Sequence, residues 1–185
     1  MKKEFPLLAL VSAVFMAFQF ILSKELMYLC GIIFSRIIIA MVLVGFSVGG
    51  FLSFLKCLRQ NFYPKVLIAI PLSIFVADFI FRRFIVPHVP FNQSSGILLS
   101  LIFVFPFIFF GMYFARIFDE KKKKKAFLWN GLGLMAGAVI SGKIFKLFGW
   151  ETGIPAICLF LFLLAVIFNR GFRKVTVLYL FFVVL

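Results

Sequence analysis

A chain of 185 residues that is 64% hydrophobic and holds 30 phenylalanines carries more apolar surface than one water-soluble core buries, since soluble domains are typically about 45–50% apolar. The composition therefore excludes an ordinary soluble domain and predicts a membrane protein. The formal net charge of +14 would suit a nucleic-acid ligand. However, the basic residues lie between hydrophobic runs, as topogenic charges do, so we expect no nucleic-acid partner.

The apolar runs predict the fold in chain order. A helix that crosses a bilayer needs about 20 predominantly apolar residues, and the sequence supplies six such runs and the start of a seventh. We therefore expect an all-α, polytopic transmembrane bundle that forms one domain over residues 1–185, with the lipid bilayer as its first partner. The expected spans are residues 5–22, 26–55, 66–81, 96–118, 126–148, 154–168 and, as a partial span, 175–185.

The boundaries between these spans follow charges, prolines and glycines. Residues 23–25 separate the first two spans, residues 82–95 form the longest loop, and residues 149–153 predict a tight turn. The first run begins with basic residues, as a secretory signal does, but no small-residue cleavage site follows it. We therefore expect a retained span. The last run of 11 residues reaches about half a bilayer core, which predicts either a partial or re-entrant helix or a piece of a longer chain.

The distribution of lysine and arginine indicates the orientation. Five consecutive lysines, Lys121, Lys122, Lys123, Lys124 and Lys125, lie between the fourth and fifth spans, and such clusters stay on the cytoplasmic side. With the N-terminus inside, the cytoplasmic segments hold 14 of the 20 basic residues, the outer segments hold 5, and Arg36 lies within a span. We therefore predict a cytoplasmic N-terminus in a bacterial cytoplasmic membrane, with the lysines placed to contact anionic lipid.

Two ionisable residues are expected inside the spans. Arg36 lies about ten residues into the second span from the outside, and Asp78 lies about twelve residues into the third span from the inside, so both reach roughly 12–15 Å below the outer face. Antiparallel neighbours would bring them together, and an isolated charge at this depth is costly. The sequence therefore predicts an Arg36–Asp78 ion pair, either as a stabilising contact alone or as part of a transport site.

The other polar groups are few. Gln19, Lys24 and Glu25 gather at the outer end of the first span, either as an interfacial cap or as a polar patch that faces a cavity or a partner. Three isolated cysteines and a single histidine, His88, have no metal-ligand spacing. The sequence also offers no nucleophile–base pair and no dinucleotide-binding loop. We therefore expect no metal or cofactor, and the sequence does not favour catalysis by this chain.

Glycines recur at intervals of four residues in two spans. Gly133 and Gly137 share one helical face in the fifth span, and Gly45 and Gly49 share one in the second. Missing side chains at this spacing let helix backbones approach closely, which promotes helix association in lipid. The sequence therefore predicts that both faces are helix-packing surfaces.

Two stretches of the sequence carry a recurring pattern. The first stretch holds Gln19, Lys24, Glu25, Gly31, Gly45 and Gly49-Gly50, and the second holds Pro106, Gly111, Phe127, Asn130, Gly133, Gly137 and Gly149. Together they resemble the membrane region that is attached to spermidine-synthase-like proteins, in the polyamine aminopropyltransferase family. Phe127, Asn130 and Lys24 stand where that pattern usually has tyrosine, aspartate and arginine.

This resemblance implies a membrane module without the enzyme. The family's catalytic part is a Rossmann-like domain that binds decarboxylated S-adenosylmethionine through a glycine-rich loop and acidic residues, and no such loop is present in this sequence. The module would anchor or accompany an aminopropyltransferase-type domain or a separate chain. Two alternatives stay open: a fragment of a small-molecule transporter or permease, and a structural membrane protein that associates, for example as a homo-oligomer, through its glycine faces.

Overall fold

The computed structural model describes residues 4–54, 63–85, 101–118 and 123–168, and this part of the chain is helical without any β-strand. Its elements are α1 (Glu4–Cys30), α2 (Ile32–Ser53), α4 (Tyr63–Ile80), η1 (Phe81–Ile85), α6 (Val104–Ile117) and α7 (Lys123–Phe168). The predicted all-α architecture is therefore confirmed. The partial span 175–185, residues Lys121 and Lys122, and His88 lie outside the described residues.

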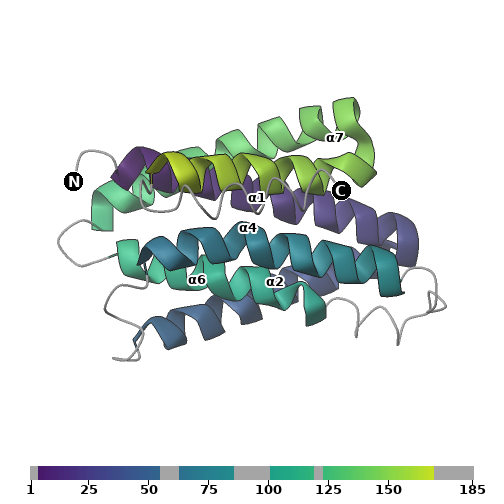
Figure 1. Cartoon of the computed structure of the whole chain (residues 1–185), viewed down its shortest axis with the longest axis horizontal. Helices are drawn as coiled ribbons and strands as arrows, with labels where there is room; N and C mark the ends of the chain where they lie inside the picture. The colour runs from purple at the N-terminus through teal and green to yellow at the C-terminus, as the bar shows by residue number, and fades with distance from the viewer. Residues whose placement is uncertain (1–3, 55–62, 86–100, 119–122, 169–185) are drawn as a thin grey trace.

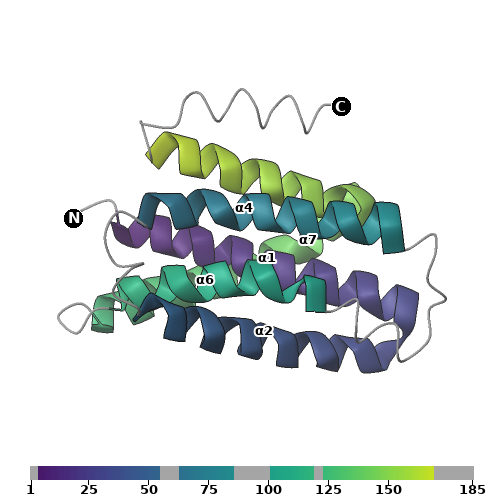
Figure 2. The ribbon, with the colours of Figure 1, turned by 60° about the horizontal axis from the view of Figure 1, so that its bottom comes forward.

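Consecutive helices run in opposite directions along one long axis (Figures 1 and 2). In Figure 1, α1 and α4 run from left to right, whereas α2 and α6 run back. The end of α6 and the start of α7 therefore lie at the same end of the bundle as the start of α1. We call this end, which carries Arg116 and Lys123–Lys125, the basic end, and the end that carries the α1–α2 junction the far end.

The first helix is longer than expected. Residues 23–25 were expected to interrupt it, but α1 continues to Cys30, because lysine and glutamate are good helix formers. The reversal occurs instead at Gly31, whose φ of 92° is a conformation that glycine adopts without the Cβ penalty of other residues. Two residues that were expected at the membrane surface, Lys24 and Glu25, are therefore part of the helix.

The third helical segment also extends beyond the expected boundary. Helix α4 runs to Ile80 and continues directly into η1, a single turn of π-helix from Phe81 to Ile85. Arg82 and Arg83, which were expected in a loop, therefore belong to this helical segment. A π-turn widens the helix locally and is frequent at functional sites. This one directly follows the last turn of α4, which carries Asp78.

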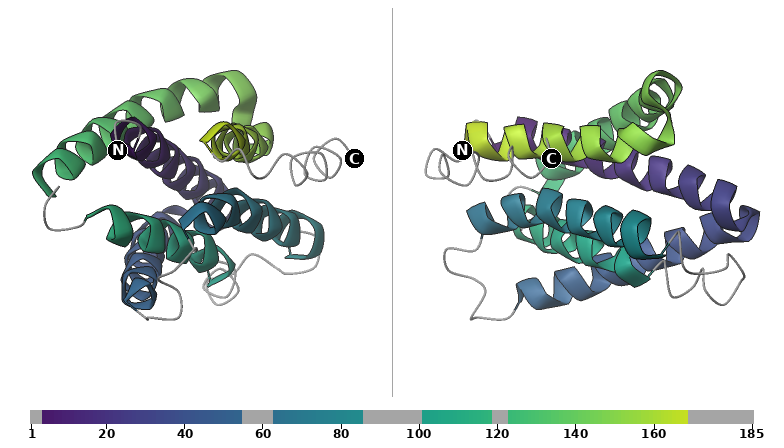
Figure 3. Two further views of the ribbon diagram at one scale, coloured as in Figure 1. Left: turned by 60° about the vertical axis from the view of Figure 1, so that its left-hand side comes forward. Right: turned by 45° about the vertical axis from the view of Figure 1, so that its right-hand side comes forward.

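Helix α7 folds back on itself. A straight helix would separate Gly137 from Phe160 by about 34 Å, yet both residues line the same cavity. A Cβ atom added at Gly153 would also lie 4.0 Å from the side chain of Ile144. The helix therefore bends sharply between Ile144 and Gly153, and the two limbs are clear in Figure 3. Pro155 lies just after the bend, where its ring opposes the carbonyl one turn earlier.

The expected turn at residues 149–153 is thus a bent stretch of helix. Its backbone keeps helical hydrogen bonding, unlike the tight non-helical turn predicted from the sequence. The chain nevertheless reverses there, and the limbs on either side correspond to the two runs that were expected as separate spans.

Helix α1 occupies the centre of the bundle. It packs against α7 and α2, while α6 packs against α2 and α4, and α4 also contacts α7. On the side that faces α2 and α6, α1 makes aromatic contacts: the ring of Phe15 contacts the rings of Phe46, Phe107, Phe110 and Phe114 at centroid distances of 4.9–6.1 Å. Edge-to-face ring pairs of this kind stabilise a core beyond the area that they bury.

Large apolar side chains also cover the outside of the bundle. Ile39, Leu43, Val48 and Phe51 are exposed on α2. The exposed side chains on α7 include Phe127, Leu128, Leu132, Met135, Val139 and Leu147. Within the part of the chain that the structure describes, three helical segments are long and apolar enough to cross a membrane: Phe5–Leu29, Arg36–Ser53 and Lys123–Leu147. An apolar exterior on this scale is typical of a surface that contacts lipid or a partner.

Candidate functional site

Three charged side chains from two helical segments converge near the far end of the bundle. Arg82 in η1 lies between two carboxylates: its Nη2 is 3.1 Å from Oε1 of Glu25 on α1, and its Nε donates a hydrogen bond of 2.9 Å to Oδ1 of Asp78 on α4. We call these three residues the Glu25–Asp78–Arg82 cluster. It joins α1 to the end of α4 through charge rather than through apolar packing.

The burial of the three side chains is unequal. The side chain of Glu25 is 0% exposed, that of Asp78 is nearly buried, and that of Arg82 is 27% exposed. The spacing of four residues puts Asp78 and Arg82 on one face of their helical segment. The Arg82 side chain is therefore partly exposed at the surface, while its guanidinium contacts the buried carboxylate of Glu25. Charges this deep are costly unless they are paired.

The predicted ion pair between Arg36 and Asp78 is not formed in this structure. The side chain of Arg36 is exposed on α2, whereas α4, which carries Asp78, packs against α6 and α7. Asp78 is buried and paired, as expected, but its partner is Arg82, one turn away on its own helical segment. The prediction failed because α4 continues into η1, which brings a nearer cation into reach.

The predicted polar cluster of Gln19, Lys24 and Glu25 separates into different environments. Glu25 is buried, whereas Gln19 and Lys24 are partly exposed. The amine of Lys24 lies 5.8 Å from the ring centroid of Phe20, a cation–π distance. Neighbouring residues on a helix point about 100° apart, so Glu25 turns toward the core while Lys24 stays at the surface.

One buried polar contact between α1 and α7 was not anticipated. The hydroxyl of Ser12 donates a hydrogen bond of 2.7 Å to the Leu8 carbonyl oxygen and lies 2.8 Å from Oδ1 of Asn130. Serines inside helices commonly donate a hydrogen bond to the carbonyl oxygen one turn earlier. Ser12 was therefore not distinguishable in the sequence as a residue that contacts an asparagine on another helix.

The glycines at intervals of four residues lie where helix backbones meet. A Cβ atom added at Gly133 would clash with backbone atoms of Ala9, and one at Gly137 would lie 2.8 Å from Cα of Ala13. Across the bundle, a Cβ atom at Gly45 would lie 2.5 Å from Cβ of Phe107, and one at Gly49 would clash with the carbonyl group of Ile108. These glycines therefore set the close contacts α1–α7 and α2–α6.

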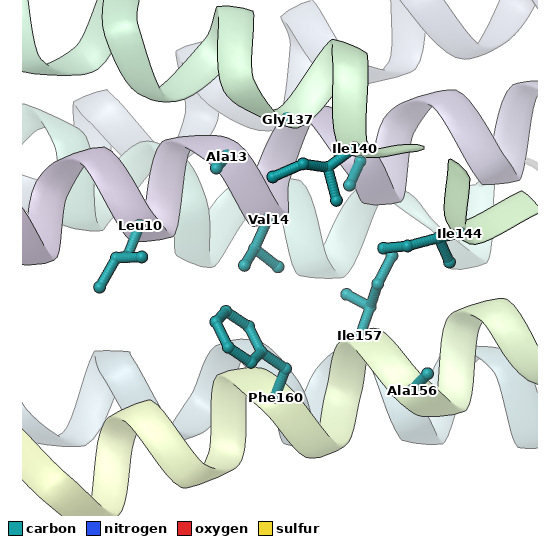
Figure 4. A pocket seen from close by; sticks show the side chains of 10 residues that line it. Leu10, Ala13, Val14, Gly137, Ile140, Ile144, Ala156, Ile157 and Phe160 are labelled. Atoms are coloured by element: carbon teal, nitrogen blue, oxygen red, sulfur yellow. The ribbon is translucent and has the colours of Figure 1, made fainter. Parts of the chain in front are cut away.

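An apolar cavity of about 340 Å³ opens between α1 and the two limbs of α7 (Figure 4). Its walls are formed by Leu10, Ala13, Val14, Ala17, Gly137, Ile140, Ile144, Ala156, Ile157 and Phe160. Two of these residues, Ile140 and Phe160, are each 47% exposed, so the cavity lies at the surface of the bundle. The cavity carries no charged side chain, and it is therefore suited to an apolar group.

The basic end contains the part of the lysine run that the structure describes. Lys123, Lys124 and Lys125 form the first turn of α7 with exposed side chains, and Arg116 is exposed in the last turn of α6. These residues lie at the end opposite to the Glu25–Asp78–Arg82 cluster. The bundle thus separates a positive surface from a buried ionic cluster.

No group of three or more histidine, cysteine, aspartate or glutamate residues is arranged for metal binding among residues 4–54, 63–85, 101–118 and 123–168. Comparison of the chain with protein-family models, with curated proteins and with solved structures gives no match. The resemblance to the membrane region of spermidine-synthase-like proteins therefore stays a prediction.

Proposed function

We propose that this chain is an integral membrane module that holds a soluble aminopropyltransferase-type domain or chain at the cytoplasmic surface. The observation that carries the membrane part of this proposal is an apolar exterior combined with buried carboxylates. Apolar residues such as Phe51 and Met135 cover the outside, whereas Glu25 and Asp78 are buried. A water-soluble bundle would be destabilised by that arrangement, but a lipid-embedded bundle is stabilised by it.

The orientation of the module follows from its ends. The exposed residues Arg116 and Lys123–Lys125 share one end, which is the cytoplasmic end under the positive-inside rule. The far end, with Gly31 and the Glu25–Asp78–Arg82 cluster, then lies toward the outer face. A soluble enzymatic partner would meet the basic end, where anionic lipid headgroups also gather.

The tight helix contacts support an anchoring role. Gly133 and Gly137 bring the backbones of α1 and α7 together, and Gly45 and Gly49 do the same for α2 and α6. Contacts of this kind leave little space for one helix to slide past another. The soluble partner itself is inferred from the sequence resemblance, which supplies the aminopropyltransferase part of the proposal.

The test of this function measures where aminopropyl transfer occurs. Membranes from cells that make the chain, and from cells that lack its gene, are assayed for transfer of the aminopropyl group from decarboxylated S-adenosylmethionine to a diamine. The proposal predicts activity that sediments with the membranes and moves to the soluble fraction, or is lost, when the gene is deleted. Equal sedimenting activity in both preparations would contradict it.

The apolar cavity favours a second candidate, a carrier for a lipid-like molecule. Its walls are apolar, and two of its lining residues, Ile140 and Phe160, are exposed on the outside of the bundle, where lipid would lie. Ala156→Phe would fill the cavity, whereas Ala136→Phe adds the same side chain at an exposed position. Vesicles that lose transfer of a fluorescent lipid with the first variant but not with the second would favour the carrier; equal transfer with both would exclude it.

A further inference from the structure

We propose that the Glu25–Asp78–Arg82 cluster binds one monovalent cation at the carboxylate of Glu25. The cluster lies at the far end of the bundle, away from the basic end where the aminopropyltransferase partner would bind. Three observations support this binding of a cation: the charge balance of the cluster, the hydrogen bonding of Glu25, and the position of Arg82.

The described charges of the cluster do not balance. Two carboxylates, Glu25 and Asp78, face one guanidinium, that of Arg82, so the ionised cluster carries one excess negative charge. The other described basic residues nearby in the sequence point elsewhere: Lys24 lies against Phe20, and Arg83 is exposed. An excess charge in surroundings of low polarity is costly, and one bound positive charge removes that cost.

The oxygens of Glu25 show where that positive charge would sit. Arg82 approaches Oε1, and neither Oε1 nor Oε2 accepts a hydrogen bond from a described residue, although both atoms are buried. A carboxylate accepts hydrogen bonds or metal coordination through both oxygens, and buried polar atoms are nearly always satisfied. Oε2 is therefore the atom at which we place the cation.

The cluster also lies close to the surface of the bundle. Glu25 lies five residues before the last residue of α1, Cys30, which is about 8 Å along the helix axis. The side chain of Arg82 is 27% exposed and leads from the surface to Glu25. It belongs to the π-turn η1, an element that recurs at functional sites because it displaces side chains from the regular helical positions.

The charge balance also selects the class of ion. A monovalent cation brings the cluster to neutrality, whereas a divalent ion would leave an excess positive charge. Two kinds of ligand could supply the single positive charge at the carboxylate oxygen. One is a proton, and the other is a solute cation such as sodium, potassium or a primary ammonium ion.

The experiment uses the full chain, purified in detergent, and measures its thermal unfolding midpoint. Sodium, potassium or methylammonium chloride replaces N-methylglucamine chloride at constant ionic strength, first in alkaline and then in mildly acidic buffer. A solute cation at 100 times its dissociation constant is expected to raise the midpoint by about 5 °C or more in alkaline buffer. A midpoint that instead rises on acidification, independently of the salt, identifies the proton as the ligand.

Variants link the response to the cluster. Glu25→Gln and Asp78→Asn each remove the excess charge, so both are expected to lose the response to cations and to acidification. Arg82→Gln leaves two carboxylates and is expected to strengthen the response, whereas Arg83→Gln, the same change at the exposed neighbour, keeps the wild-type response. A wild-type midpoint that changes with neither cations nor acid, or a Glu25→Gln variant that responds like the wild type, would overturn the proposal.

Discussion

Two contacts of α1 use opposite means to join helices. Toward α7, α1 meets Gly133 and Gly137 backbone to backbone, with no charged group at the contact. Toward η1, it is joined through the carboxylate of Glu25 and the guanidinium of Arg82. The first contact depends on the absence of side chains at the two glycines, so a larger residue at either position would clash with α1. The second depends on charge, so it responds to ions. The comparison suggests that the glycine contacts fix the bundle, while the ionic contact is the part that the surroundings can influence.

The largest expected effect is on the glycine contact. Gly137→Leu places a Cβ atom 2.8 Å from Cα of Ala13, and backbone atoms cannot rotate away as a side chain can. We expect a loss of about 3 kcal/mol in the free energy of unfolding, measured by titration with a denaturing detergent.

Gly142→Leu is the matched control for this substitution, because a Cβ atom at Gly142 meets nothing within 4 Å. Gly142→Leu should change the free energy of unfolding by no more than about 1 kcal/mol, and this change includes the higher helix propensity of leucine compared with glycine. Equal losses for the two variants would contradict the close contact between α1 and α7.

The ionic contact is expected to give the next largest effect. Arg82→Gln leaves the carboxylates of Glu25 and Asp78 without their shared cation. We expect a loss of about 2 kcal/mol, below the 3–5 kcal/mol of a fully buried pair, because Arg82 is partly exposed. In contrast to the glycine variants, this loss of unfolding free energy should vary with the salt in the sample.

Arg83→Gln is the control, and it should change the free energy of unfolding by less than about 0.5 kcal/mol. If it lost as much as Arg82→Gln, the contact of Arg82 with the two carboxylates would not explain the loss.

Two adjacent glycines in α2 differ in how closely they approach α6, and substitution by alanine tests this difference. A Cβ atom at Gly49 would lie 2.9 Å from the backbone nitrogen of Met112 on α6, whereas one at Gly50 meets nothing within 4 Å. Gly49→Ala is therefore expected to destabilise the bundle by about 1–2 kcal/mol. Gly50→Ala should be neutral or slightly stabilising, and the reverse order in the same unfolding titration would show that α2 packs through another face.

The smallest expected effect concerns the polar contact within the glycine-lined interface. Ser12→Ala removes the hydroxyl that lies 2.8 Å from the amide oxygen of Asn130. Hydrogen bonds between membrane helices contribute about 0.6 kcal/mol on average, and we expect a loss of that order. Ser47→Ala, at an exposed serine that bonds only within α2, is the control. A Ser12→Ala loss no greater than that of the control would show that shape alone holds this interface.

The sequence predicted the helical class and the surfaces that carry glycines, because both depend on local composition and spacing. It did not predict where α1 ends. The charges at Lys24 and Glu25 suggested a membrane surface, yet Glu25 is accommodated inside by an arginine more than fifty positions away in the chain. The pairing of a buried carboxylate with a distant arginine depends on the tertiary arrangement, so the sequence around Glu25 does not indicate it. The failed Arg36–Asp78 pairing has the same origin, since the choice of partner depended on how far α4 continues.

Chemical labelling of the two ends of the bundle shows whether the chain spans the membrane and which end faces the cytoplasm. Single cysteines at Lys124 and Arg83, in a variant without Cys30, Cys57 and Cys158, are exposed to a membrane-impermeant maleimide in spheroplasts before and after permeabilisation. We predict that residue 83 is labelled from outside and that residue 124 is labelled only after permeabilisation. Labelling of residue 124 in intact spheroplasts would contradict the assigned orientation, and a chain that leaves the membrane fraction on alkaline extraction would contradict the membrane bundle itself.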